Sequence, residues 1–496
     1  MWLFDPSRAR RRLMTAAPLL LVLGGAGCAT LRTTLRGYDV GPNGISRPQH
    51  RLREALAAGD FVRALAWKEE DELLERLIRA TSAYYAGQFL RAGALLDTAA
   101  SVSDDRITAR VSRDALALVT NDNARPYRPR RTERLFIPYY GMLAYSRAGS
   151  WSDAAVEARR LVALLAQHDG DRNERERPLH ATLEHLSGAV LERAGYPDEA
   201  QVAYRAASRM LDQAPERFER PAADEGELLV VLERGYVAHR VTEKIDLYIG
   251  DDDERRHGRG ARRGSADEPD GTAPSSSDGA SSSSSTGASS PAGDPRRTTN
   301  ASSVLAPVGA PAPDSARPPR RRKHDRDDDD YWISIAFPVL RHSTRAWGAT
   351  VRLVVDSGAT AATVRLTSVV DEAASVDEGR DRLAMLARAT ARAGAKYALA
   401  KAAKDRKGEL AGTLANYGAS LLERADVRSW HLLPQEIQLL RVHAPAGTRR
   451  VRLEVSDRGA TRTIELGYVA VRAGTTTIHT VRLWRDGHGG GVIGAR

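Results

Sequence analysis

The chain has 496 residues, which is long enough for two or three domains that each bury a sizeable core. Its single cysteine excludes an internal disulfide framework and a zinc site built from cysteines of one chain. The 74 lysines and arginines outnumber the 64 acidic residues and give a net charge of +10. Because the two signs are interleaved along helical segments, this charge predicts solvated helix faces rather than nucleic-acid binding.

The first 28 residues have the layout of an export signal. A basic stretch at residues 8–12 precedes an apolar run at 13–23, and the small residues 25–27 lead to Cys28. The apolar run is too short to cross a bilayer, which takes about 20 apolar residues. We therefore expect residues 1–27 to be a signal peptide and Cys28 to be the site of lipidation.

This segment resembles the lipobox of bacterial lipoproteins, although Gly25 stands where that family usually has leucine. The resemblance implies a diacylglycerol on Cys28, which becomes the mature N-terminus and anchors the chain in a membrane. Ala29, in place of aspartate, implies the outer membrane. We expect a lipoprotein of the cell envelope that faces the periplasm. Export also argues against a nucleic-acid partner. Cleavage by an ordinary signal peptidase is the alternative, and it would release a soluble periplasmic protein.

Residues 28–250 are predicted to form helices with a recurring turn. At four places a glycine between two amphipathic segments is followed five residues later by alanine. The pairs are Gly59 and Ala64, Gly87 and Ala92, Gly149 and Ala154, and Gly195 and Ala200. The pattern resembles tetratricopeptide repeats, in which small residues let two antiparallel helices approach closely. The spacing departs from the usual period of about 34 residues, so we expect an irregular array, with a plain helical bundle as the alternative.

A polar, proline-containing loop separates the second and third helical pairs, and Thr132 with Glu133 is expected to begin the next helix. Its charged and aromatic content exceeds what a connector requires. The candidate partner contacts here are Arg128, Arg130, Arg131, Tyr139 and Tyr140.

Residues 251–330 are rich in serine, proline and glycine, and they are poor in apolar side chains that could offset chain entropy. We expect a disordered linker that spans on the order of 50 Å by random-coil scaling.

Residues 331–485 alternate apolar and polar side chains and predict a smaller α+β domain with an antiparallel sheet. Strands are expected at 331–340, 350–356, 362–370, 436–445, 448–457, 463–474 and 476–484. A long alanine-rich helix is expected at about 376–428, and a flexible tail at 486–496. The predicted fold class is thus mainly α, with a helical-repeat domain, a linker and this second domain.

Two segments, residues 121–149 and 425–455, together with the lipobox, resemble a largely uncharacterised family of proteobacterial outer-membrane lipoproteins. That resemblance implies a helical-repeat N-terminal half and a role in the cell envelope, because genes of the family often lie near those of lipoproteins that activate penicillin-binding proteins. It implies no catalytic residues and no cofactor.

Three features invite a chemical interpretation. Asp356 in the segment VRLVVDSGATAATV resembles the catalytic turn of retropepsin-like aspartic proteases, which would require a homodimer, although a plain hairpin turn explains the same residues. His180 and His185 are five residues apart and do not share a helical face, so no metal site is predicted. Trp430, between a helix and a strand, is either a surface contact or a packing anchor.

The sequence therefore predicts a lipid-anchored, non-catalytic adaptor that binds an envelope protein or peptide in the groove of its helical repeats, without a cofactor. Two alternatives remain open: a homodimeric protease that uses Asp356, and a purely structural envelope protein.

Overall fold

The computed structural model describes residues 45–108, 125–212, 221–249, 331–342, 350–356, 360–407, 425–457 and 460–484. The predicted signal peptide (1–27), Cys28, the predicted linker (251–330) and the predicted tail (486–496) lie outside these ranges. The described residues on the two sides of the linker, up to Tyr248 and from Tyr331, belong to one compact unit.

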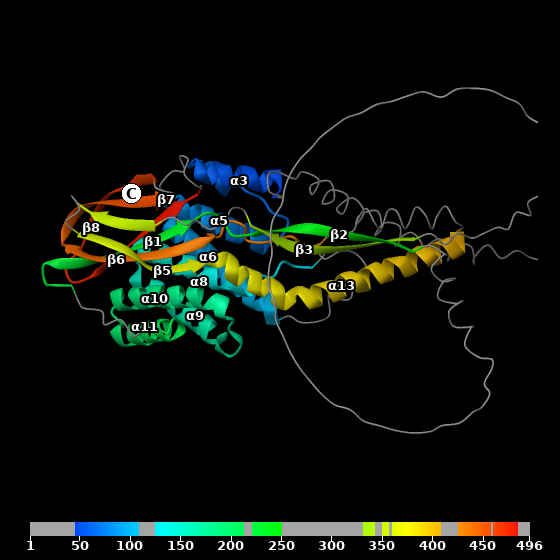
Figure 1. Cartoon of the computed structure of the whole chain (residues 1–496), viewed down its shortest axis with the longest axis horizontal. Coiled ribbons are helices and arrows are strands. Elements are labelled where there is room, and N and C mark those ends of the chain that lie inside the picture. The colour runs from blue at the N-terminus through cyan, green and yellow to red at the C-terminus, as the bar shows by residue number, and fades with distance from the viewer. Residues whose placement is uncertain are drawn as a thin grey trace, which may run out of the picture. The chain divides into compact units, whose positions relative to one another are not determined.

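The N-terminal half contains four consecutive helical hairpins (Figure 1). Their helices are α3 (Arg47–Ala57) with α4 (Phe61–Leu65), α5 (Glu72–Tyr85) with α6 (Phe89–Thr108), α8 (Arg131–Ala148) with α9 (Trp151–Ala166), and α10 (Arg177–Arg193) with α11 (Pro197–Met210). Two short 3₁₀ helices, η3 (Asp169–Asp171) and η4 (Glu174–Glu176), connect α9 to α10.

The same turn closes all four hairpins. Its glycine, Gly59, Gly87, Gly149 or Gly195, has a positive φ between 76° and 92°. In each turn the glycine N–H donates to the carbonyl three residues earlier, and the next N–H donates to the carbonyl five residues earlier. This is the Schellman arrangement, which favours glycine because other residues are strained at positive φ. The alanine five residues after each glycine is at most 1% exposed, so the predicted hairpins are confirmed.

Seven strands form one sheet in the order β8-β7-β4-β5-β6-β1-β9. They are β1 (Glu225–Arg234), β4 (Thr350–Val355), β5 (Thr360–Val369), β6 (Glu436–Pro445), β7 (Gly447–Asp457), β8 (Ala460–Val471) and β9 (Thr476–Leu483). Neighbours are antiparallel except β1 and β9, which are parallel. The strands β2 (His239–Ile249) and β3 (Tyr331–Arg341) form a separate two-stranded sheet, against which helix α13 (Val370–Lys407) packs.

The strands predicted after residue 330 are confirmed, but residues 225–249 form β1 and β2 where we expected helix. β1 pairs with β6 and β9, so the sheet is built from both sides of the linker. The chain is accordingly a mixed α/β protein with antiparallel sheets rather than a mainly α one with a separate second domain. The run Leu228–Leu232 is buried on both faces, and such a short apolar run does not distinguish a strand from a buried helix. Helix α13 begins six residues earlier than expected, and residues 425–435 contain no helix.

The sheet separates two cores. On one face, Leu228, Val230 and Leu232 of β1 pack with aliphatic side chains of β4, β6, β7, β8 and β9. On the other face, Leu229 and Val231 join the helices in the larger core. The sheet thereby covers part of the surface of the helical hairpins.

Among the described residues, no helix combines the length and the apolar character needed to cross a membrane.

Candidate functional site

Tyr139 and Tyr140 lie in the interface between the helices and the sheet, and both are 0% exposed. The Tyr139 hydroxyl donates to Glu233 of β1 at 3.0 Å, and the Tyr140 hydroxyl lies 2.9 Å from that of Tyr85. The prediction that these two tyrosines contact a partner is therefore wrong. A large aromatic side chain gains more from burial between two layers than from exposure, and here its hydroxyl finds an internal partner.

Buried tyrosine hydroxyls and charged groups contact one another at the centre of this interface. Glu233 accepts a hydrogen bond from the Tyr85 hydroxyl at 2.6 Å, and Arg482 lies 3.9 Å from the same carboxylate. Burial raises the pKa of Tyr85 and Tyr139, so both remain protonated donors. This network joins helices to strands, and we assign it a role in stability rather than in binding.

The three predicted arginines lie elsewhere, around a cavity of about 630 Å³. Arg128 is exposed, while Arg130 and Arg131 are half-buried where the loop enters α8. The remaining polar lining comes from α8, from the end of α9, from η3 and from the first turns of α13. It consists of Arg134, Gln167, His168, Asp171, Asp377, Arg380 and Asp381.

A second cavity of about 300 Å³ adjoins the first, and the two share Arg128, Pro129, Arg130 and Asp381. We call the two together the arginine pockets. Their linings contain nine arginines and four aspartates. The arginines are Arg125, Arg128, Arg130, Arg131, Arg134, Arg240, Arg380, Arg388 and Arg428. Such a lining favours ligands that carry negative charge.

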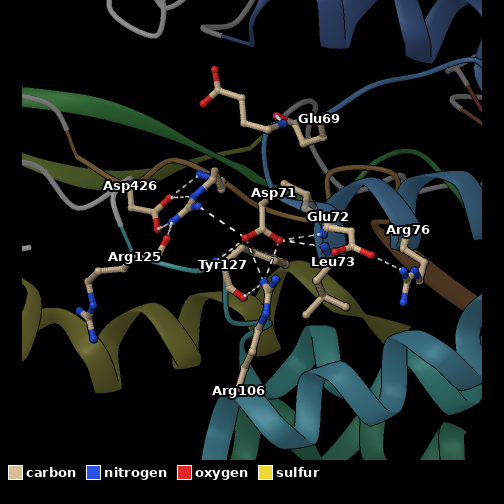
Figure 2. Close-up of polar contacts among 12 residues, drawn as sticks. Glu69, Asp71, Glu72, Leu73, Arg76, Arg106, Arg125, Tyr127 and Asp426 are labelled. Atoms are coloured by element: carbon tan, nitrogen blue, oxygen red, sulfur yellow. Dashed lines mark hydrogen bonds and ion pairs between the residues drawn. The ribbon is translucent and has the colours of Figure 1, made fainter. Parts of the chain in front are cut away.

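Asp71, at the N-terminus of α5, fixes the start of the loop (Figure 2). Its carboxylate accepts hydrogen bonds from the N–H groups of Leu73 and Leu74 and from that of Tyr127 at 2.8 Å. Both oxygens also accept from Arg106, at 2.8 and 2.9 Å. One carboxylate thus joins α5, the end of α6 and the loop that carries Arg128.

Glu133 fixes the other end of the loop. One of its oxygens accepts from the Arg130 N–H and from the Tyr127 hydroxyl, both at 2.8 Å. The other accepts from the N–H of Trp430 at 2.8 Å. The guanidinium groups of the loop therefore project from a backbone that is fixed at both ends by hydrogen bonds to Asp71 and Glu133.

Several lining arginines already have acidic partners. Arg130 pairs with Asp381, Arg131 with Asp171 at 2.7 Å, and Arg380 with Glu176 at 2.6 Å. A ligand carboxylate would join these existing networks. Arginine suits that role because its planar group binds one carboxylate through two parallel hydrogen bonds and retains further donors.

Three lining residues carry a buried polar atom for which no described residue supplies a hydrogen bond: Arg131 (Nε), His168 (Nδ1) and Asp377 (Oδ1). Burial, reinforced by Arg131 and Arg134, lowers the pKa of His168 to about 4, so its imidazole is neutral at pH 7. Burial raises the pKa of Asp377, against the hydrogen bonds from Thr132. Unsatisfied buried groups are rare in proteins and often mark places where a ligand or an ion binds.

The geometry around Asp356 adds no support for the protease interpretation. Asp356 has φ +54° and accepts a hydrogen bond from the Arg450 N–H at 3.1 Å, with Arg449 at 3.3 Å. These contacts are those of a turn aspartate, and residues 357–359 of the motif lie outside the described ranges. Where the structure describes the chain, no group of three His, Cys, Asp or Glu side chains is arranged to hold a metal ion.

Trp430 is a packing anchor, which is one of the two roles that the sequence suggested for it. Its side chain is 0% exposed, and its Nε1 donates to the Thr81 hydroxyl at 3.0 Å.

Sequence reasoning found the arginines of the loop but missed Asp171, Asp377 and Arg380. These come from two further segments that only the fold brings to the loop. The charged run DGDRNERER at residues 169–177 was the one local signal for this side of the site. No protein-family model matches the chain, and comparisons with curated proteins and with solved structures found no similar protein.

Proposed function

We propose that this protein is a non-catalytic adaptor of the cell envelope that binds an acidic segment of a partner protein in the arginine pockets. The observation that carries the proposal is the lining of two adjoining cavities by nine arginines and only four aspartates. An acidic segment supplies side-chain carboxylates at a spacing that can engage arginines of both cavities at once.

The proposal keeps the partner class predicted from the sequence and moves its binding site. The helical hairpins resemble tetratricopeptide repeats in their glycine turns and close alanine contacts, and such arrays commonly bind peptides on their concave face. In this chain residues of the sheet pack against the hairpins in one core, which leaves less of the helical surface open to a partner. The arginine pockets, at the end of α9 and the start of α8, are therefore the better site for a partner.

The resemblance of residues 19–30 to a lipobox supports an anchor at the outer membrane through Cys28. Replacing this residue, as Cys28→Ser, removes the only thiol that can carry the lipid. We expect the variant to move from the membrane fraction to the soluble fraction, whereas the wild type sediments with the membrane.

Photo-crosslinking in cells tests the binding site directly. A photo-reactive amino acid in place of Gln167, which is exposed and lines the larger cavity, would capture the partner and report the segment that lies against it. The same substitution at Gln201, exposed on α11 and outside the cavities, is the matched control. We expect a specific adduct at Gln167 alone, at an Asp- and Glu-rich peptide of the partner.

The charge reversal Arg128→Glu should remove this adduct, because it places a carboxylate where the partner's carboxylates bind. Arg128 is exposed, so the change disturbs the fold less than changes at Arg130 or Arg131, which hold Asp381 and Asp171. Arg91→Glu makes the same charge change on the exposed surface of α6 and should leave the adduct intact. Persistence of the adduct in Arg128→Glu would contradict recognition of an acidic segment by the arginine pockets. Absence of any adduct at Gln167 would favour the purely structural role.

A further inference from the structure

A third cavity, of about 380 Å³, lies between α9, α10 and α11 and shares no residue with the arginine pockets. Its volume lies within the usual range for small-molecule sites, which begins at about 300 Å³. One wall is apolar and includes Val162, Val202 and Met210. Val202 is 54% exposed, which leaves an apolar surface for a ligand to cover.

Glu184 of α10 lies in the lining of this cavity although its side chain is only 3% exposed. No described residue donates a hydrogen bond to its Oε2 atom. Burying an ionised carboxylate without hydrogen-bond donors costs free energy. This cost falls when a positively charged donor binds beside the carboxylate. The group that best complements Glu184 is therefore an ammonium group.

The charged residues around Glu184 define the other end of the ligand. Arg172 is engaged with Asp169 and with His180, whose Nδ1 lies 2.9 Å from the Arg172 Nε. Arg177 lies 3.8 Å from Asp212. Arg209, on the exposed side of α11, has no ion-pair partner among the described residues and can donate hydrogen bonds to a ligand carboxylate.

We propose that this cavity binds a small zwitterionic ligand, an α-amino acid with an apolar side chain. Its ammonium group lies against Glu184, its carboxylate against Arg209, and its side chain on the wall formed by Val162, Val202 and Met210. This inference is independent of the adaptor function, because the two sites have no lining residue in common.

Proton release is a signature of this binding mode. Burial raises the pKa of Glu184 to about 8, with Asp169 acting in the same direction and Arg172 and Arg209 in the opposite one. The ammonium group binds the ionised carboxylate, so below pH 8 binding must release a proton. Affinity should then fall by about 50-fold between pH 8 and pH 6, as follows from the fraction of Glu184 that is ionised. Because the pKa of His180 is lowered to about 3, this histidine stays neutral throughout that window.

Isothermal titration calorimetry of the purified full chain at pH 8 tests the proposal with three matched probes. L-leucine carries both charged groups, 4-methylpentanoate lacks the ammonium group, and leucinamide lacks the carboxylate. We expect L-leucine to bind and each of the other two probes to bind at least about tenfold more weakly. A tenfold loss of affinity corresponds to about 1.4 kcal/mol, and the loss of one ionic contact should cost at least this much.

Glu184→Gln keeps the shape of the side chain and removes its charge, and it should weaken L-leucine binding at least about tenfold while abolishing proton release. Glu157→Gln is the matched control, since Glu157 is also a buried carboxyl, with a pKa raised to about 7 by burial, but lies outside the cavity. The proposal is overturned if L-leucine does not bind the wild type at about 10 mM, a concentration at which even weak ligands register. Equal binding of L-leucine and 4-methylpentanoate to the wild type would also overturn it, whatever the stability of the variants.

Discussion

At the residue scale, the geometry of the arginine pockets depends on side chains that do not line them. Asp71 is 9% exposed, and its two oxygens receive five hydrogen bonds from α5, from Arg106 and from the Tyr127 N–H. Burial by itself would raise the pKa of Asp71, but the hydrogen bonds from Arg106 and Tyr127 outweigh it and lower the pKa. The carboxylate is thus ionised and fixes the loop at neutral pH.

Replacing Asp71 with asparagine should lower the free energy of unfolding by about 3 kcal/mol, because the amide cannot accept all of these bonds and leaves Arg106 without its anion. Urea denaturation at pH 7 measures the loss. Asp60→Asn is the control, since Asp60 caps α4 through a single exposed bond to the Arg63 N–H, and it should cost less than about 1 kcal/mol. Equal losses in the two variants would contradict the role given to Asp71.

The stability difference between wild type and Asp71→Asn should also depend on pH. A carboxyl whose pKa is lowered in the folded state contributes stability above its unfolded pKa of about 3.9, and this contribution is lost as the pH falls through the folded value. The stability difference between wild type and Asp71→Asn should therefore be constant from pH 7 to about 5 and shrink below about pH 4.

At the element scale, the helical hairpins depend on glycines at positive φ. Gly149 has φ +79°, and a Cβ atom added there would meet nothing within 4 Å. The cost of Gly149→Ala is then purely that of the backbone, about 1 to 2 kcal/mol, and should appear as a lower melting temperature. Gly170→Ala is the control, because Gly170 has equally open surroundings without the positive φ. A similar loss at Gly170 would show that the turn conformation is not the cause.

The turns were predictable because their signal is local. A glycine and an alanine five residues apart lie within one turn and the first helical residues after it, and these residues make the same bonds in all four hairpins. β1 was not predictable in this way. Leu228 to Leu232 show no alternation, and what makes them a strand is pairing with β6 and β9, far along the chain.

The residues of the candidate site were likewise predictable only where they lie close together in the sequence. Arg128, Arg130 and Arg131 stand together in one loop and were found from composition, whereas Asp377 and Arg380 reach that loop only through tertiary packing. Tyr139 and Tyr140 were misread because aromatic residues suit both a binding surface and a core. The choice between the two depends on what covers the helix, and the sheet covers it.

At the scale of the whole molecule, the residues on the two sides of the linker share one sheet and one core. A protease site inserted near the middle of residues 251–330 should therefore give two pieces that remain associated after cleavage, because β1 holds ten paired residues with β6 and eight with β9. Size-exclusion chromatography of the cleaved protein tests this expectation. The N-terminal piece expressed alone should be insoluble, since Leu229 and Val231 would lose the partner strands. Separation of the cleaved pieces would contradict the shared sheet.

The position of β1 also sets the order in which this protein can fold. Arg234 pairs with Glu436 in β6 and with Leu483 in β9, so both neighbours of β1 are synthesised roughly 200 or more residues after it. At about 5 to 20 residues per second, a growing chain holds an unpaired apolar strand for tens of seconds. Contacts between such distant segments also form slowly, because a long loop must close first. The seven-stranded sheet, and the core that it shares with the helices, can therefore be completed only after the last strand has been synthesised.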